Sequence, residues 1–166
     1  IDVNIISTQK DNLKLSNILD KNKPNIIISS SETWQPFRAH LTLLNDYIIK
    51  KYINIKFSFI YISEAHATDI WPIGLSAGVL NKKHVSIDDR LRCLDNMKAR
   101  YNLECDCYID TMYNEYRDTY SAWPFRIYAI HNNKILYKSN MVNSEYNIDE
   151  LFKILDDLND LSINKP

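Results

Sequence analysis

Two short apolar runs, with an amphipathic segment between them, constrain the fold of this chain more than any other feature. Residues 26–30 and 55–62 are rich in Ile, Phe and Tyr, which predicts two buried strands. Between them, apolar residues recur at steps of four, three, four and four, the spacing of one helix face. These positions are Phe37, Leu41, Leu44, Ile48 and Tyr52. A strand, a helix and a second strand in this order predict a parallel βαβ unit.

The rest of the chain continues the alternation. The further predicted elements are a helix over 86–100, a strand over 105–110, a short helix over 112–120, strands over 125–131 and 134–138, and a final helix after Asn147. Asn132-Asn133 is a two-residue hairpin signal, and Asn147 with Glu150 predicts a helix cap. We therefore expect an α/β, thioredoxin-like fold over residues 1–166. It would be a single domain with a central mixed β-sheet, flanking helices, and a C-terminal β-hairpin and helix.

Composition excludes several classes of function. There are 20 basic and 21 acidic side chains, so the sequence offers no basic surplus for a nucleic-acid partner. The two glycines cannot form a phosphate-binding loop. Three cysteines without paired spacing predict neither a disulfide framework nor a metal site, and they favour a reducing compartment. No run reaches ~18 apolar residues, so we expect no membrane span.

Polar segments follow the predicted strands at one edge of the sheet. In an open α/β sheet, ligands bind beyond the carboxyl ends of the parallel strands. The three segments expected there are 29–37, 63–69 and 123–126. We therefore place the candidate site at this edge.

The segment Tyr61–Trp71, with the sequence Y-I-S-E-A-H-A-T-D-I-W, resembles a motif of the iodothyronine deiodinases, Y-I-E-E-A-H-P-S-D-G-W. The blocks 109–112, 122–128 and 135–138 also resemble family blocks, in order. The resemblance extends from about Asn12 to Leu158. It implies a thioredoxin-superfamily oxidoreductase that removes iodine from an aromatic substrate such as thyroxine.

The chain departs from the family at the centre of the site. The family reads G-S-C-T-U-P-P-F, where U is selenocysteine or, in many microbial members, cysteine. Alignment of Ser31, Thr33 and Pro36 places Trp34 at the nucleophile position. An indole can neither attack a halogen nor complete a redox cycle. Either Trp34 is a UGA selenocysteine codon read as tryptophan, or the chain is an inactive relative.

The resemblance implies a role for each site residue. A selenol or thiol at position 34, at a helix N-terminus, would be ionised and would take iodine from the ring. His66 would deliver a proton, because imidazole titrates near pH ~6.5, and Glu64 would orient it. An external thiol would then reset the enzyme, without any bound cofactor. From sequence alone, His66 and Glu64 are equally compatible with ordinary loop positions.

Four further residues are candidates by the same resemblance. Pro124 is the expected cis-proline beside the nucleophile, and Arg126 would clamp a substrate carboxylate. Arg126 could instead form a surface ion pair. His84 corresponds to a histidine implicated in substrate or proton handling. Cys105 corresponds to a proposed resolving thiol, although strand alternation places Cys105 and Cys107 on one face and equally supports a buried structural role.

Three functions follow as alternatives. The first is thiol- or selenol-dependent reductive dehalogenation. The second is a peroxiredoxin-like hydroperoxide or disulfide reductase, since the same nucleophile reduces peroxides. The third is a binding module without catalysis, with Trp34 as a stacking platform. Expected partners are an iodinated aromatic molecule and a thiol donor. Animal members of the family are membrane-anchored dimers. The resemblance therefore also implies a homodimer, a catalytic domain that faces the cytoplasm, and an anchor upstream of Ile1.

Overall fold

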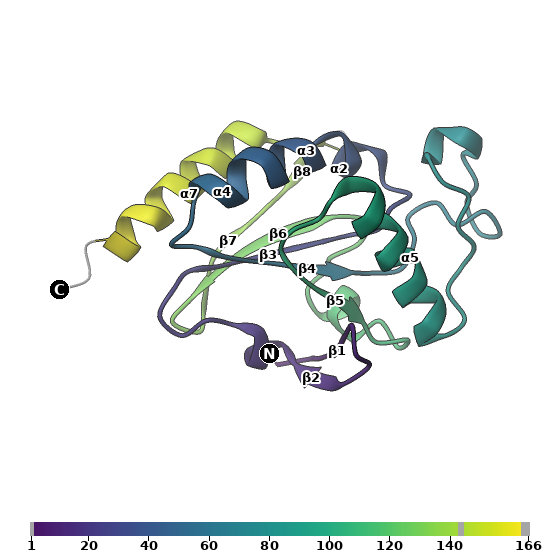
Figure 1. The fold of residues 1–166 in the computed structure, drawn as a ribbon, viewed down its shortest axis with the longest axis horizontal. Coiled ribbons are helices and arrows are strands. Elements are labelled where there is room, and N and C mark those ends of the chain that lie inside the picture. The colour runs from purple at the N-terminus through teal and green to yellow at the C-terminus, as the bar shows by residue number, and fades with distance from the viewer. Residues whose placement is uncertain (1, 143–144, 164–166) are drawn as a thin grey trace.

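A seven-stranded mixed β-sheet forms the centre of the structure, a computed structural model that describes residues 2–142 and 145–163 (Figure 1). Its strand order is β2-β1-β5-β4-β3-β6-β7, and β3, β4 and β5 are parallel to one another. The strands are β1 (Asn4–Ser7), β2 (Asn12–Lys14), β3 (Asn25–Ser30), β4 (Lys56–Tyr61), β5 (Asp106–Asp110), β6 (Arg126–His131) and β7 (Lys134–Lys138). A second, two-stranded sheet pairs β8 (Met141–Val142) with β9 (Glu145–Tyr146).

The helical segment predicted over 36–52 is present but is divided into short pieces. They are α2 (Gln35–Ala39), α3 (Leu41–Leu43), the π-helical η1 (Leu44–Ile48) and α4 (Ile49–Lys51). The break between α2 and α3 lies at His40, whose ring bonds to the Pro36 carbonyl at 2.9 Å. The His40 amide donates to the Phe37 carbonyl, three residues back, so the regular pattern of i→i−4 hydrogen bonds is interrupted there.

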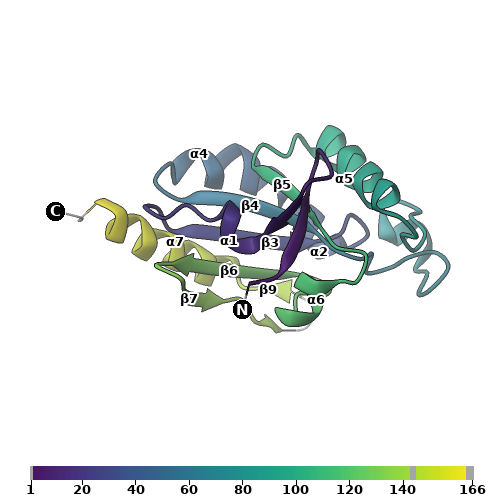
Figure 2. The same ribbon diagram turned by 90° about the horizontal axis from the view of Figure 1, so that it is seen from below.

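Helices cover both faces of the sheet (Figures 1 and 2). The larger core lies under α2–α4, α5 (Ile87–Tyr101) and α7 (Ile148–Ile163), and it includes Phe59, Leu94 and Leu155. The smaller core lies on the other face under α1 (Leu15–Ile18) and α6 (Glu115–Thr119). Strands buried on both faces explain why 26–28 and 59–62 are continuously apolar rather than alternating.

The helix N-caps and the hairpin turn have the predicted geometry. The Ser86 side chain accepts from the Asp89 amide at the start of α5, and Asn147 accepts from the Asp149 and Glu150 amides at the start of α7. Asn132 and Asn133 both have positive φ, as a type I′ hairpin turn requires. No helix among the described residues has the length and apolarity needed to cross a membrane.

The N-terminal hairpin of β1 and β2 was not predicted. The apolar run of β1 is only two residues long, Ile5-Ile6 between Asn4 and Ser7, so it carries no clear periodic signal. In the structure β1 pairs with β5 along the sheet, and that pairing stabilises the short strand. The hairpin therefore extends the sheet on the side away from β6.

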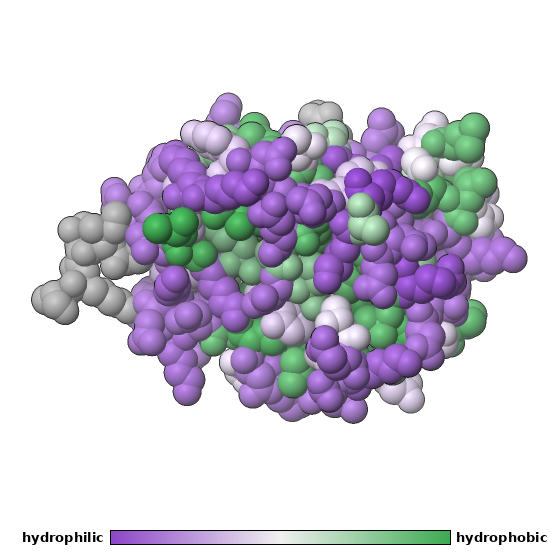
Figure 3. All heavy atoms as spheres, viewed as in Figure 1, coloured by the Kyte–Doolittle hydropathy of each residue, from purple (hydrophilic) through white to green (hydrophobic). Residues whose placement is uncertain are grey.

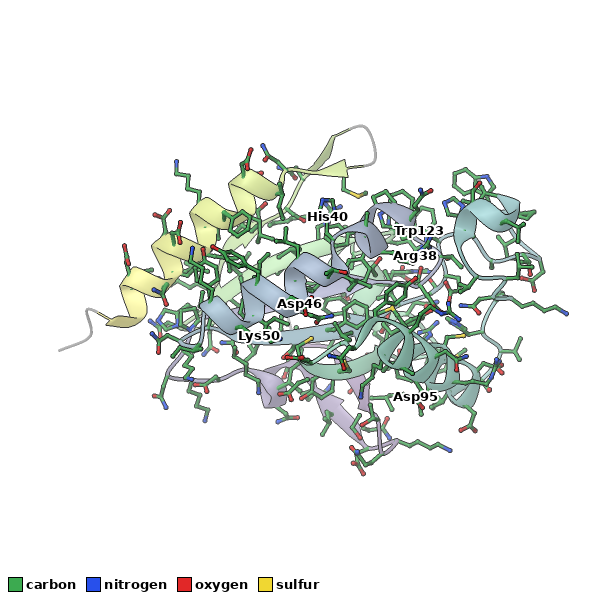
Figure 4. The ribbon with its side chains drawn as sticks, turned by 45° about the horizontal axis from the view of Figure 1, so that its top comes forward. Arg38, His40, Asp46, Lys50, Asp95 and Trp123 are labelled. Carbon is green, nitrogen blue, oxygen red and sulfur yellow. The ribbon has the colours of Figure 1, made fainter. Side chains whose placement is uncertain are left out.

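The strand register brings the predicted site segments to one edge. Ser30 pairs with Tyr61, and Tyr61 pairs with Ile109, so β3, β4 and β5 end at nearly the same level. In Figure 4, Arg38 and Trp123 lie toward this end of the sheet, whereas Lys50 lies toward the other end of the α2–α4 segment. The site therefore occupies the carboxyl edge, as the sequence predicts.

Candidate active site

Trp34 occupies the position expected for the nucleophile. It follows β3 as the N-cap residue of α2, and Pro36 lies in the first turn. The indole is half-buried and stacks on the His66 ring, with 5.8 Å between ring centroids and an angle of 17°. His66 in turn meets Trp71 edge-on at 5.2 Å. Residue 34 and His66, 32 positions apart in sequence, are therefore in contact.

His66 is held through its backbone, and its ring is buried. The amide of His66 donates to Thr33 Oγ1 at 3.0 Å. Its side-chain Nδ1 is enclosed and has no hydrogen-bond partner among the described residues. A buried imidazole nitrogen without a partner is unusual in folded proteins. It is a free proton donor or acceptor beside residue 34.

Glu64 is the most heavily hydrogen-bonded side chain of the site. Its carboxylate accepts from Thr33 Oγ1 at 2.7 Å, the Thr33 amide at 3.2 Å, Asn81 Nδ2 at 3.0 Å and the Tyr61 hydroxyl. His84 Nε2 donates to it at 3.2 Å. Burial raises the pKa of Glu64, but the bonds from His84, Tyr61 and Thr33 outweigh that effect and hold the pKa below its usual value. Glu64 is therefore an ionised group that fixes the loop carrying residue 34.

His84 connects Glu64 to a buried arginine. Arg90 Nε donates to His84 Nδ1 at 3.2 Å, so that nitrogen is unprotonated and Nε2 carries the hydrogen given to Glu64. Arg90 also donates to the carbonyls of Asp110 and Thr111 and to Asn114 Oδ1. Burial lowers the pKa of Arg90, and the nearby Asp110 carboxylate opposes the change. Arg90 therefore selects one neutral tautomer of His84.

Arg90 was not among the predicted site residues. One signal was available, because Arg90 lies four residues before Leu94 and seven before Met97, on the apolar stripe of α5. A charged residue on a buried stripe requires a polar partner inside the protein. The identity of that partner depends on the tertiary contact with His84.

Glu32 is a second buried carboxylate beside Thr33. It is paired with Arg100, which reaches across from the end of α5, and the Arg38 guanidinium donates to the Glu32 carbonyl. Burial raises the pKa of Glu32, Arg100 opposes that shift, and the charge of Glu64 adds to it. Nothing in the local sequence predicts this ion pair, because Arg100 lies 68 positions away from Glu32.

The Trp123–Pro124 peptide bond is cis, as predicted. The Pro124 carbonyl accepts from Ser30 Oγ at 3.2 Å, which ties this segment to the end of β3. Trp123 Nε1 approaches the Glu64 carbonyl at 3.5 Å. The cis-proline segment thus borders the same edge as residue 34 and Glu64.

None of the hydrogen bonds of Arg126 in the described part of the chain is with residue 34, Glu64 or His66. Its Nη1 donates to the Ser139 carbonyl at 2.6 Å, and its Nε and Nη2 donate to the Ser121 carbonyl at 3.2 and 3.1 Å. All three guanidinium nitrogens therefore donate to backbone carbonyls. The predicted carboxylate clamp is not preformed in this structure.

Cys105 lies at the wrong edge of the sheet to act as a resolving thiol for residue 34. It precedes Asp106, which pairs with Ser58, and Ser58 pairs with Ile27 near the start of β3. Cys105 is thus level with about Ile26, and the four residue steps from there to Ser30 span ~13 Å, with residue 34 beyond that end of β3. The expectation for Cys105 is therefore corrected. Its hydrogen bond with Cys107 and, after that, burial raise the pKa of the Cys105 thiol, which also weakens it as a nucleophile.

One cluster has the composition of a metal site. Glu64, His84 and Cys93 each bring a ligand atom within 4.8 Å of the others. Burial raises the pKa of the Cys93 thiol to about 12, and His84 and Glu64 already bond to each other. Arg90 also adds a positive charge at His84. A protonated thiol beside a buried cation is a poor cation site, so we treat the cluster as a hydrogen-bonded network.

A cavity of about 370 Å³ adjoins the Glu64 network. Its wall combines aromatic and apolar side chains with cationic ones. The lining residues are Ser63, Glu64, Ala65, Ala67, Ile70, Trp71, Lys83, His84, Arg90, Met112, Asn114, Arg117 and Trp123. Hydrophobic residues cover the surface around η2 (Gly74–Ala77), beside this region (Figure 3).

The sheet order, the cis-proline and the loop after β3 define a protein of the thioredoxin-like class. Solved structures agree. A secreted disulfide oxidoreductase from Mycobacterium tuberculosis has a TM-score of 0.62 at 12% identity, covering 94% of this chain and 96% of that one. A thioredoxin-like protein from Porphyromonas gingivalis has a TM-score of 0.63 at 13% identity, covering 95% and 90%.

Within that class, the chain belongs to the iodothyronine deiodinase family, whose family model matches residues 2–159. It is 31% identical over 138 residues to type I iodothyronine deiodinase of Xenopus laevis, covering 83% of this chain and 54% of that protein. It is 32% identical over 152 residues to thyroxine 5-deiodinase of Gallus gallus, covering 89% and 58%. The chain thus spans about half the length of the curated relatives it matches.

Proposed function

We propose that this domain carries out thiol-dependent reductive deiodination of an iodinated aromatic substrate, with a selenocysteine or cysteine at position 34. The observation that carries the proposal is the contact between residue 34 and His66, at a loop fixed by the ionised Glu64. The relatives named thyroxine 5-deiodinase supply the substrate class.

The reaction balances with a thiol donor as the reductant. The chalcogen anion at position 34 takes iodine from the ring carbon as a selenenyl or sulfenyl iodide, while that carbon gains a proton. One thiol displaces iodide and forms a mixed selenenyl sulfide or disulfide. A second thiol releases the chalcogenol and a thiol disulfide. The ring is reduced, and two thiols are oxidised.

His66 is the residue placed to move the proton. Its Nδ1 has no protein partner among the described residues, and its ring lies against residue 34. Glu64 acts through Thr33, which bonds both the Glu64 carboxylate and the His66 amide. We assign Glu64, Thr33 and His84 as positioning residues because their hydrogen bonds join them to one another and to the His66 amide, and not to the side chain of residue 34.

The test begins at codon 34 of the transcript. A UGA codon followed by a selenocysteine insertion element supports the proposal. The protein test compares Trp34→Cys and Trp34→Sec with Trp34→Ser as the matched control without a redox-active chalcogen. With dithiothreitol as the donor, the first two should release iodide from thyroxine and the control should not. Failure of both chalcogen variants contradicts the proposal.

Two alternatives have distinct signatures. A peroxiredoxin-like reductase would consume hydrogen peroxide with the same variants and leave thyroxine unchanged. A genuine tryptophan codon, UGG, favours a binding module, and the stacking of Trp34 on His66 is the observation that supports this reading. Homodimerisation and membrane attachment remain proposals taken from the longer family members.

A further inference from the structure

The cavity beside Glu64 has the chemistry of a site for an aromatic anion. Trp71 and Trp123 line it and remain 58% and 40% exposed, so both indoles are available to a ligand ring. Ile70 and Met112 extend the apolar wall. A volume of about 370 Å³ is within the range of small-molecule pockets.

The charges on the wall favour a negative ligand. Lys83, Arg90 and Arg117 line the cavity, against the single carboxylate of Glu64. The Glu64 charge is already compensated by the donors of Thr33, Tyr61, Asn81 and His84. The basic side chains therefore leave an excess of positive charge facing the cavity.

Of the two arginines that line the cavity, Arg117 is the one with a hydrogen-bond donor to spare. Its Nη1 donates to Ser63 Oγ at 3.1 Å and its Nε to Asp118 at 2.7 Å, and no residue in the described part of the chain accepts from Nη2. Asp118 is largely exposed, so this ion pair is screened by solvent and weak. Each nitrogen of Arg90, in contrast, already has an acceptor or a ring partner.

Arg126 does not line this cavity, and its three nitrogens hold the Ser121 and Ser139 carbonyls. Freeing its guanidinium would leave these carbonyls without their donors. Arg117 needs no such rearrangement, because Nη2 is open and its partners are the Ser63 hydroxyl and an exposed carboxylate.

We propose that this cavity binds the carboxylate-bearing aromatic substrate, with Arg117 receiving the carboxylate and Trp71 and Trp123 contacting the ring. The inference rests on the proposed function for the identity of the ligand as an iodinated aromatic acid. It assigns carboxylate recognition to Arg117 instead of Arg126.

The experiment uses the chain with Trp34, because binding needs no nucleophile. The probes are 3-(4-hydroxy-3,5-diiodophenyl)propionic acid and its primary amide, titrated by isothermal calorimetry. The acid should bind more tightly than the amide. Arg117→Gln should weaken acid binding about ten-fold and leave amide binding unchanged, as expected for loss of one charge-assisted contact. The affinity of Arg117→Lys for the acid should lie between those of the unsubstituted chain and Arg117→Gln, since lysine keeps the charge and loses the planar donor pair.

Two controls keep the result interpretable. Arg126→Gln and Arg92→Gln remove an arginine that does not line the cavity and should leave both affinities unchanged. Equal thermal unfolding temperatures for the Arg117 variants would show that weaker binding is not unfolding. Loss of acid binding in Arg126→Gln with no change in Arg117→Gln overturns the assignment, as does equal binding of acid and amide.

Failure of this inference and failure of the proposed function are distinguishable. If Trp34→Sec releases iodide and Arg117→Gln does not alter its KM, the function stands and the cavity assignment fails. If Arg117 controls acid binding but no chalcogen at position 34 releases iodide, the binding site stands and the deiodinase proposal fails.

Discussion

Glu32 and Glu64 lie on either side of Thr33, and both are almost fully buried, yet burial has a different outcome for each. Glu64 receives hydrogen bonds from four residues, and its pKa is lowered. Glu32 is paired with Arg100, whose side chain is half-exposed, and burial raises the pKa of Glu32 against the opposing effects of Arg100, Asn81 and Arg38.

The opposite directions of the two pKa shifts indicate that several hydrogen-bond donors offset burial more fully than one flexible cation does. Each donor replaces part of the lost hydration of Glu64. Tyr61 ends β4, Thr33 lies just beyond the end of β3, and Asn81 and His84 belong to the segment before α5. Arg100 must extend a long side chain over Glu32, which costs rotamer entropy. Four substitutions test this contrast.

The largest effect is expected for Glu64→Gln. The amide cannot accept all the donors that converge on it, so we expect a loss of about 3 kcal/mol in the free energy of unfolding at pH 7. The folded pKa is lowered, so the stabilisation is complete above the unfolded value near 4.5 and is lost as pH falls through the folded value. Urea unfolding of both proteins from pH 7 to pH 3 should show the difference shrinking below about 4.5. A pH-independent difference would contradict this account.

Arg90→Gln should have the next largest effect. It removes donors from the Asp110 and Thr111 carbonyls and from His84 Nδ1, at a cost of about 2 kcal/mol. Nitrogen chemical shifts of His84 should show only the Nε2–H tautomer in the unsubstituted chain and a mixture in the variant. Arg92→Gln, on the exposed face of the same helix, is the control and should change stability by less than ~0.5 kcal/mol.

Thr33→Val should cost about 1.5 kcal/mol, because it keeps the side-chain shape but removes the hydroxyl between Glu64 and the His66 amide. Thr33→Ser keeps that hydroxyl and should retain most of the stability. Chemical unfolding measures both. In a Trp34→Sec background, Thr33→Val should also lower kcat more than it changes KM. Equal losses in the Val and Ser variants would show that packing, and not the hydroxyl, matters here.

The smallest effect is expected for Glu32→Gln, at about 0.5 kcal/mol or less. The folded pKa of Glu32 is raised, so its ionisation costs stability as pH rises above the unfolded value near 4.5. Relative to the unsubstituted chain, the variant should therefore gain stability between pH 4 and pH 7, opposite in sign to Glu64→Gln. A loss at pH 7 as large as that of Glu64→Gln would show that the Arg100 pair stabilises the loop strongly.

Much of the fold was predictable because its signals are local. The apolar runs that become β3 and β4, the Asn132-Asn133 turn and the cap at Asn147 all depend on residues within a few positions of one another. The edge on which residue 34, Glu64 and Pro124 gather also followed from the parallel strand order. The interrupted helix at His40 did not, since the competing bond to Pro36 is a matter of side-chain geometry.

The contacts that set the chemistry of the site were not predictable in the same way. The sequence by itself determined which loops meet, that His66 can reach residue 34, and that tryptophan stands where a nucleophile is expected. Only the tertiary structure decided that Arg90 donates to His84 and that Arg100 pairs with Glu32 across 68 positions. It also decided that Arg126 donates to backbone carbonyls, whereas Arg117 lines the cavity. Periodicity and capping arise from interactions within one or two turns of chain. The direction of a long charged side chain is set by whichever buried acceptor the packing of distant elements leaves within its reach.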